Sequence, residues 1–174
     1  MLADAQSSMR HNYINGGPGV IISGLVWLIA AIVTTFIGFN GGMIAFFIGG
    51  MLIHPVSVLV ENKMKQEAAA PDKGLIRLSL LTLPLLFGGL FLAYILSVQN
   101  QALFYPVMAI VIGLRYVAFQ RIYGLNIFII LGTLLAFVGA LFLFRQLEPV
   151  FVVPIVVGVV ELFFGTYLTR RKLT

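Results

Sequence analysis

Six long apolar stretches alternate with short polar segments along the chain. Each stretch is close to the roughly 20 residues that an α-helix needs to cross about 30 Å of hydrocarbon. The pattern predicts an all-α integral membrane bundle of six transmembrane helices, forming one domain over residues 1–174. We expect the spans at about residues 18–39, 42–60, 75–97, 102–120, 125–144 and 149–168.

The connections between these stretches predict how neighbouring helices pair. Asn40-Gly41-Gly42 is a turn signal between the first two spans, and SVQNQ separates the third from the fourth. Arg145-Gln146-Leu147-Glu148 separates the fifth from the sixth, while the connection over residues 61–74 is longer. We therefore expect three helical hairpins. The polar first seventeen residues resemble no cleavable signal peptide, so the first span is expected to direct the chain to the membrane.

The distribution of lysine and arginine predicts the orientation. With both termini cytoplasmic, nine basic residues fall on the inner side and only Arg145 falls outside. The nine are Arg10, Lys63, Lys65, Lys73, Arg77, Arg121, Arg170, Arg171 and Lys172.

Composition narrows the classes of function. The chain is 60% hydrophobic and 10% charged, whereas about 25% of residues in soluble domains are charged. The net charge of +5 does not indicate nucleic-acid binding, because the basic residues mark the helix ends instead of forming one patch. With no cysteine and only two histidines, no metal site is expected. We find no catalytic triad and no phosphate-binding loop, so we expect no catalytic residue and no cofactor.

Three titratable residues lie inside the apolar stretches: His54, Arg115 and Glu161. An ionised side chain at the centre of a membrane helix costs about 2.5–3.5 kcal/mol on insertion scales, so such residues are rare unless they are paired or functional. They lie about 5–7 residues from the inner ends of three spans that run in the same direction. At 1.5 Å per residue, all three are expected roughly 8–11 Å below the inner boundary.

Residues at one depth can meet if their helices are neighbours. Arg115 and Glu161 could then form an ion pair, with His54 as a titratable partner and Tyr116 in the same binding or gating group. Pro55 and Pro84 predict kinks in the second and third spans. The alternative is structural. Arg115 could extend to the headgroups, Glu161 could be a protonated, hydrogen-bonded acid, and His54 could be a neutral core residue.

Two further features have both a functional and a structural interpretation. Small residues recur four apart in several spans, which predicts close helix packing or, alternatively, a homo-oligomer seam. The basic inner rim could bind lipid headgroups, above all through Arg77, Arg121, Arg170 and Arg171, although topology alone would also produce such a rim.

Several segments together resemble a known group of proteins. SGLVWLIAAIV, GGMLIHPVSVLV and FYPVMAIVIGLRYVAFQRIYGL are similar to an uncharacterised family of small bacterial six-span inner-membrane proteins, whose domain has no known function. The resemblance covers about residues 18–168 and is most specific around Pro106, Gly113, Arg115-Tyr116 and Tyr123-Gly124. It implies a location in the bacterial plasma membrane, and it implies no activity.

Two hypotheses about function follow. The first is a small transport or channel-type protein that moves an unknown solute or ion, with the His54, Arg115 and Glu161 cluster as a site or gate near the cytoplasm. The second is a structural, lipid-binding or partner-binding membrane protein, in which the cluster only stabilises helix packing. Membrane lipids are the partners common to both.

Overall fold

In the computed structural model, the described residues are 2–64, 70–145 and 149–172, and within these ranges the chain forms helices and no strand. Six helical segments are long and apolar enough to cross a membrane, which confirms the predicted all-α class and the six spans. They are α2 (Gly17–Ile37), α3 (Phe39–Met64), α4 with α5 (Lys73–Leu80 and Leu83–Gln99), α6 (Phe104–Tyr123), α7 (Ile127–Arg145) and α8 (Val152–Arg170).

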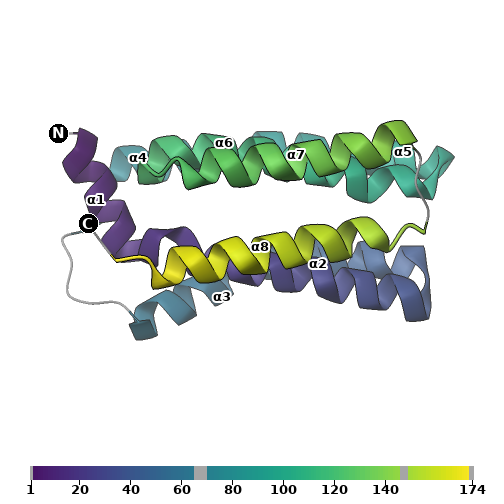
Figure 1. The fold of residues 1–174 in the computed structure, drawn as a ribbon, viewed down its shortest axis with the longest axis horizontal. Coiled ribbons are helices and arrows are strands. Elements are labelled where there is room, and N and C mark those ends of the chain that lie inside the picture. Colours follow the sequence, from purple (N-terminus) through teal and green to yellow (C-terminus); the bar gives the residue numbers. More distant parts are fainter. Residues whose placement is uncertain (1, 65–69, 146–148, 173–174) are drawn as a thin grey trace.

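The long helices lie in two layers. One layer contains α2, α3 and α8, and the other contains α4, α5, α6 and α7 (Figure 1). The most extensive helix contacts fall within the layers, between α2 and α8, α2 and α3, and α6 and α7, whereas α8 touches α6 and α7 more sparsely. We call the contact zone between the layers the seam.

Glycine allows the tightest helix contacts within each layer. A Cβ atom added to Gly24 of α2 would lie 2.9 Å from the carbonyl oxygen of Gly158 of α8. In the other layer, a Cβ atom on Gly113 of α6 would lie 2.5 Å from the carbonyl oxygen of Gly132 of α7. Because the contacts are to backbone atoms, larger residues would push the helices apart. Each layer is therefore built around one closely packed helix pair.

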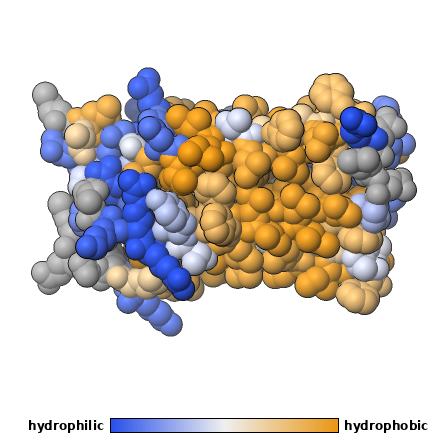
Figure 2. Space-filling view, in the orientation of Figure 1, coloured by the Kyte–Doolittle hydropathy of each residue, from blue (hydrophilic) through white to orange (hydrophobic). Residues whose placement is uncertain are grey.

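The surface has the polarity of a membrane protein. A broad hydrophobic band lies between two hydrophilic ends, and the more hydrophilic end carries both chain termini (Figure 2). Large exposed apolar side chains, among them Phe36, Phe91 and Phe163, fit a surface that faces lipid chains.

The polar N-terminus forms structure that the apolar pattern did not predict. It contains α1 (Leu2–Tyr13) and the short 3₁₀ helix η1 (Ile14–Gly16). Arg10 Nη1 donates a hydrogen bond to the carbonyl oxygen of Tyr123 at 2.8 Å, and Gln6 Nε2 donates to that of Arg121 at 2.9 Å. Buried Asn15 donates to the carbonyl oxygen of Leu168 at 3.1 Å. These bonds fix α1 and η1 to the ends of α6 and α8.

Two details of the predicted spans need correction. The turn between the first two spans is at Gly38, whose φ of 105° favours glycine, and Asn40-Gly41-Gly42 lies inside α3. The third span is not one helix, because α4 ends at Leu80 and α5 begins at Leu83. A second short 3₁₀ helix, η2 (Gln101–Leu103), precedes α6.

Candidate functional site

Glu161 lies inside the bundle, on α8. Its side chain is fully buried, at 0% exposure, and neither carboxyl oxygen has a hydrogen-bond partner. It forms no salt bridge. A buried polar group without a partner costs free energy, and an unpaired buried charge costs several kcal/mol, so structures rarely keep one without a reason. Glu161 is therefore the most unusual side chain in the described part of the chain.

The groups around Glu161 come from both layers. Ser23 and Trp27 face its carboxyl group from α2, and Tyr116 faces it from α6. All three side chains carry a polar hydrogen, and Nε1 of Trp27 is itself buried without a partner. The site thus gathers three unpartnered polar atoms, two from Glu161 and one from Trp27. We call Glu161, Ser23, Trp27 and Tyr116 the seam site.

Aromatic side chains close the seam on either side of this site. Towards the N-terminal end of α6, Trp27 packs against Phe46 with ring centroids 4.5 Å apart and against Tyr105 at 6.1 Å. Tyr105 also shares a 2.7 Å hydrogen bond with Thr34 of α2. Towards the other end of α6, Phe128 stacks on Tyr123 at 5.1 Å. Tyr116 stacks on the same Phe128 ring at 6.3 Å. The seam site is thus enclosed between two aromatic clusters.

Arg115 is held elsewhere, at the break in the third span. Its Nε donates a hydrogen bond to Oγ1 of Thr82 at 3.1 Å, and its guanidinium carbon lies 5.2 Å from the centroid of the Phe119 ring. Thr82 is buried between α4 and α5 and donates in turn to the carbonyl oxygen of Ser79 at 2.7 Å. The side chain of Arg115 therefore joins α6 to the α4–α5 break, where the cation also meets an aromatic ring.

The prediction that His54, Arg115 and Glu161 come together is wrong in this structure. Arg115 binds Thr82 and Glu161 has no partner, so the predicted ion pair is not formed. His54 is exposed on α3 beside the exposed Leu52 and Val56, whereas Glu161 is fully buried. Only Tyr116 and Glu161 of the four candidates come together. Equal depth did not bring the other side chains together, because Arg115 contacts Thr82 and Phe119, His54 is exposed, and Glu161 is buried.

The two prolines differ in their surroundings. Pro55 lies inside α3, which continues as one helix to Met64. The kink expected there remains a prediction, although Ser57 Oγ donates to the carbonyl oxygen of His54 at 2.9 Å. Pro84 occupies the first turn of α5, where its missing N–H is tolerated, directly after the break at Leu81–Thr82.

Four arginines were predicted to bind lipid headgroups. Arg77, Arg121, Arg170 and Arg171 are all exposed. Arg170 and Arg171 line an open groove beside Leu162, Phe163, Thr166 and Tyr167. Of the other rim residues, Lys65 lies outside the described residues, as does most of the Arg145–Glu148 connection.

Comparison with known proteins places the chain in a family. Residues 2–171 match the model of a family of unknown function, DUF7010. The chain belongs to this family. The predicted resemblance to an uncharacterised family is thereby confirmed. No curated protein and no solved structure matches the chain.

Family membership leaves the chemistry of this DUF7010 chain to be argued from its residues. Among the described residues, no group of three or more histidines, aspartates and glutamates could hold a metal ion. The seam site offers one carboxyl group, two hydroxyl groups and one indole N–H in an enclosed apolar setting. Such a site can hold a proton on the carboxyl group and can supply hydrogen bonds when that proton leaves.

Sequence reasoning missed Ser23, Trp27 and Thr82 in this DUF7010 chain. Serine, threonine and tryptophan are common in membrane helices as packing residues, so they carry no charge signal of the kind that revealed Glu161. Trp27 did stand out as a tryptophan in the middle of a span, away from the interface where tryptophan is usually enriched. That position is the one signal that could have connected it with the buried acid.

Proposed function

We propose that the chain is a small proton-coupled transport protein in which Glu161 gains and loses the proton. The observation that carries this proposal is the buried carboxyl group without any partner, inside a bundle with a lipid-facing surface. Ionisable residues within membrane spans commonly mark proton relays and substrate pathways. The proton is the one ligand that needs no cavity, and Glu161 lines neither the groove at the end of α8 nor the one between α3 and α5.

The surroundings of Glu161 suit a carboxyl group that changes its charge. With the proton bound, the neutral acid fits the enclosed apolar site. Without it, the carboxylate needs donors, and Ser23, Trp27 and Tyr116 are the side chains within reach. A small rotation of these side chains would create hydrogen bonds that the present conformation lacks. The charged form would therefore favour a slightly different packing of the seam.

The two-layer architecture offers a way to expose the site. Backbone contacts at glycine hold each layer together, whereas side chains make contacts across the seam, as where Tyr105 of α6 packs against Trp27 and shares a hydrogen bond with Thr34 of α2. Relative movement of the layers would disturb side chains and leave the closest backbone contacts intact. Separation of Tyr105 from Trp27 and Phe46 would open the site towards one end of the bundle, and separation of Tyr116 from Glu161 would open it towards the other end. The second opening would face the cytoplasm of a bacterial cell, because the basic residues are concentrated at that end of the bundle and cytoplasmic segments carry an excess of lysine and arginine.

The test uses the purified protein in vesicles that contain a pH-sensitive dye. After an external acid pulse, vesicles that contain the wild-type chain should acidify faster than empty vesicles. So should vesicles with the Phe128→Leu variant, which removes the ring that stacks on Tyr116 and Tyr123. Glu161→Gln should remove this difference in both backgrounds, because an amide cannot carry the proton. Glu61→Gln is the matched control, since Glu61 is a buried acid of α3 outside the seam site. Equal rates with and without Glu161 would overturn the proposal, and so would the absence of any protein-dependent flux in both backgrounds.

A further inference from the structure

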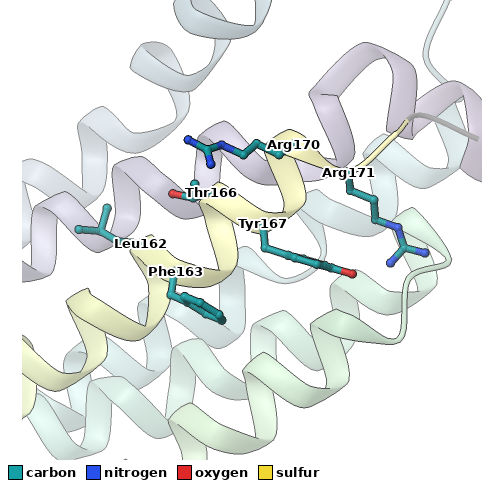
Figure 3. A pocket seen from close by; sticks show the side chains of 6 residues that line it. All are labelled: Leu162, Phe163, Thr166, Tyr167, Arg170 and Arg171. Carbon is teal, nitrogen blue, oxygen red and sulfur yellow. The ribbon is translucent and has the colours of Figure 1, made fainter.

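A groove lies on the surface of α8 near its C-terminal end. It has a volume of about 650 Å³ and is lined by Leu162, Phe163, Thr166, Tyr167, Arg170 and Arg171. Figure 3 shows Phe163 and Tyr167 projecting from the same side of the helix, while the Arg171 side chain extends beyond the helix end and the Arg170 side chain points to the opposite side. Eight residues separate Phe163 from Arg171, so the groove changes from apolar to cationic over about 12 Å of helix.

The positive charge at the end of the groove is more concentrated than these two residues alone suggest. Arg10 of α1 adds a further cation to this end of the bundle, and burial first and the charge of Arg171 second lower the pKa of the Arg10 guanidinium. The hydrogen bond from Arg10 to the carbonyl oxygen of Tyr123 fixes its position.

The apolar half of the groove is suited to an acyl chain. Phe163 is 70% exposed and Tyr167 is 49% exposed, although both rings are large. Tyrosine is typical of the membrane interface, where its hydroxyl group meets water and its ring meets hydrocarbon. In this order along α8, the charged residues lie at headgroup level and Phe163 lies at the level of the chains.

We propose that this groove binds an anionic phospholipid, with the phosphate at the C-terminal end of α8, where the long side chains of Arg170 and Arg171 can turn towards it, and with one acyl chain along Phe163. A second groove, of about 610 Å³, lies between α3 and the end of α5 and serves as a comparison. It is lined by Asn40, Ser97, Gln99 and Gln101 among others, and by no charged residue. The two grooves therefore differ in positive charge, which is the property that selects an anionic headgroup. This proposal does not depend on the proton-coupled function of Glu161.

The experiment measures lipid retention by native mass spectrometry of the detergent-solubilised full chain. The probes are phosphatidylglycerol, phosphatidylcholine and inorganic phosphate. Wild type should bind phosphatidylglycerol at least tenfold more tightly than phosphatidylcholine. Arg170→Gln with Arg171→Gln should weaken phosphatidylglycerol binding about 25-fold, from a factor of about 5 for each arginine. Arg145→Gln removes an arginine from the other end of the bundle. It should change the affinity for phosphatidylglycerol less than twofold.

The acyl-chain contact has its own matched pair of variants. Phe163→Ala should shorten phosphatidylglycerol retention several-fold, whereas Phe144→Ala, at a phenylalanine 85% exposed on α7, should not. Equal binding of the two lipids, or equal loss in the Arg145 and Arg170/Arg171 variants, would overturn the proposal. Displacement of the lipid by inorganic phosphate at matched concentration would also overturn it, because the chain contact would then contribute nothing.

Discussion

Glu161 and Arg115 are both ionisable residues within a membrane bundle, and their surroundings differ. Arg115 has a hydrogen-bond acceptor in Thr82 and an aromatic neighbour in Phe119, so its charge is partly compensated. Glu161 forms no hydrogen bond in this structure, and the groups that face its carboxyl group, Ser23, Trp27 and Tyr116, are neutral donors. An arginine that is paired and stacked is explained by packing, whereas an unpaired acid calls for a further explanation. For this reason the proposed function rests on Glu161 alone.

The first prediction at the residue scale concerns Trp27, the one tryptophan of the chain. Because its indole faces Glu161, ionisation of the carboxyl group should shift the emission of Trp27. We expect a pH-dependent shift in wild type and in Glu61→Gln, measured by fluorescence of the purified protein. In Glu161→Gln the emission should not depend on pH, and a shift that survives there would show that another group causes it.

The second prediction concerns the partner of Arg115. Thr82→Val keeps the shape of the side chain and removes the oxygen that accepts from Arg115 Nε. We expect the free energy of unfolding to fall by about 1.5–3 kcal/mol, the usual range for a hydrogen bond to a charged group. The free energy of unfolding is measured by titration with a denaturing detergent. Thr82→Ser should retain most of the stability, and an equal loss in both variants would mean that the hydroxyl group does not matter.

At the scale of elements, the close helix pairs α2–α8 and α6–α7 explain how the layers form. Gly24 and Gly158 approach each other's backbone, as do Gly113 and Gly132. Two of these positions, Gly113 and Gly132, belong to the predicted stripes of small residues, which therefore mark intramolecular packing. The expected arrangement as three hairpins stays a prediction, since α8 makes its main contacts with α2.

A glycine substitution tests this packing. In Gly158→Ala, the new Cβ atom would lie 2.8 Å from Leu28 Cγ and 2.9 Å from the carbonyl oxygen of Gly24. We expect the free energy of unfolding to fall by about 1–3 kcal/mol, as in other overpacked interiors. Gly50→Ala of α3 is the control, because its Cβ atom would meet nothing within 4 Å. The control should be neutral or slightly stabilising, since alanine is the better helix former. Similar losses in both would contradict the packing account.

The sequence predicted the helices far better than their mutual orientation. Apolar length alone located all six spans to within a few residues, because the bilayer fixes how long a span must be. The sequence predicted a kink at Pro84 but not the break at Thr82. The residues around it, LLTLPLL, are apolar on both sides of the proline, so they gave no sign that the span divides into two helices. The pairing of Arg115 with Glu161 failed for a different reason. Depth follows from residue number, but successive residues turn by about 100°, so Arg115 and its neighbour Tyr116 face different helices.

At the scale of the whole molecule, both termini lie at the more hydrophilic end of the bundle. The chain has no cysteine, so a single introduced cysteine reports its own side of the membrane. We predict that a membrane-impermeant maleimide added to intact bacterial cells labels Phe144→Cys, at the outer end of α7. It should label Arg171→Cys only after the membrane is opened. The opposite labelling pattern would reverse the proposed orientation.

The measurement closest to the central claim is infrared spectroscopy of the protein in lipid at neutral pH. A protonated carboxyl group has its own C=O band, distinct from that of a carboxylate. The account predicts that this band is present in wild type and in Glu61→Gln, is absent in Glu161→Gln, and disappears from wild type as the pH is raised. If wild type lacks the band at neutral pH, or if the band persists in Glu161→Gln, Glu161 does not carry the proton and the account is wrong.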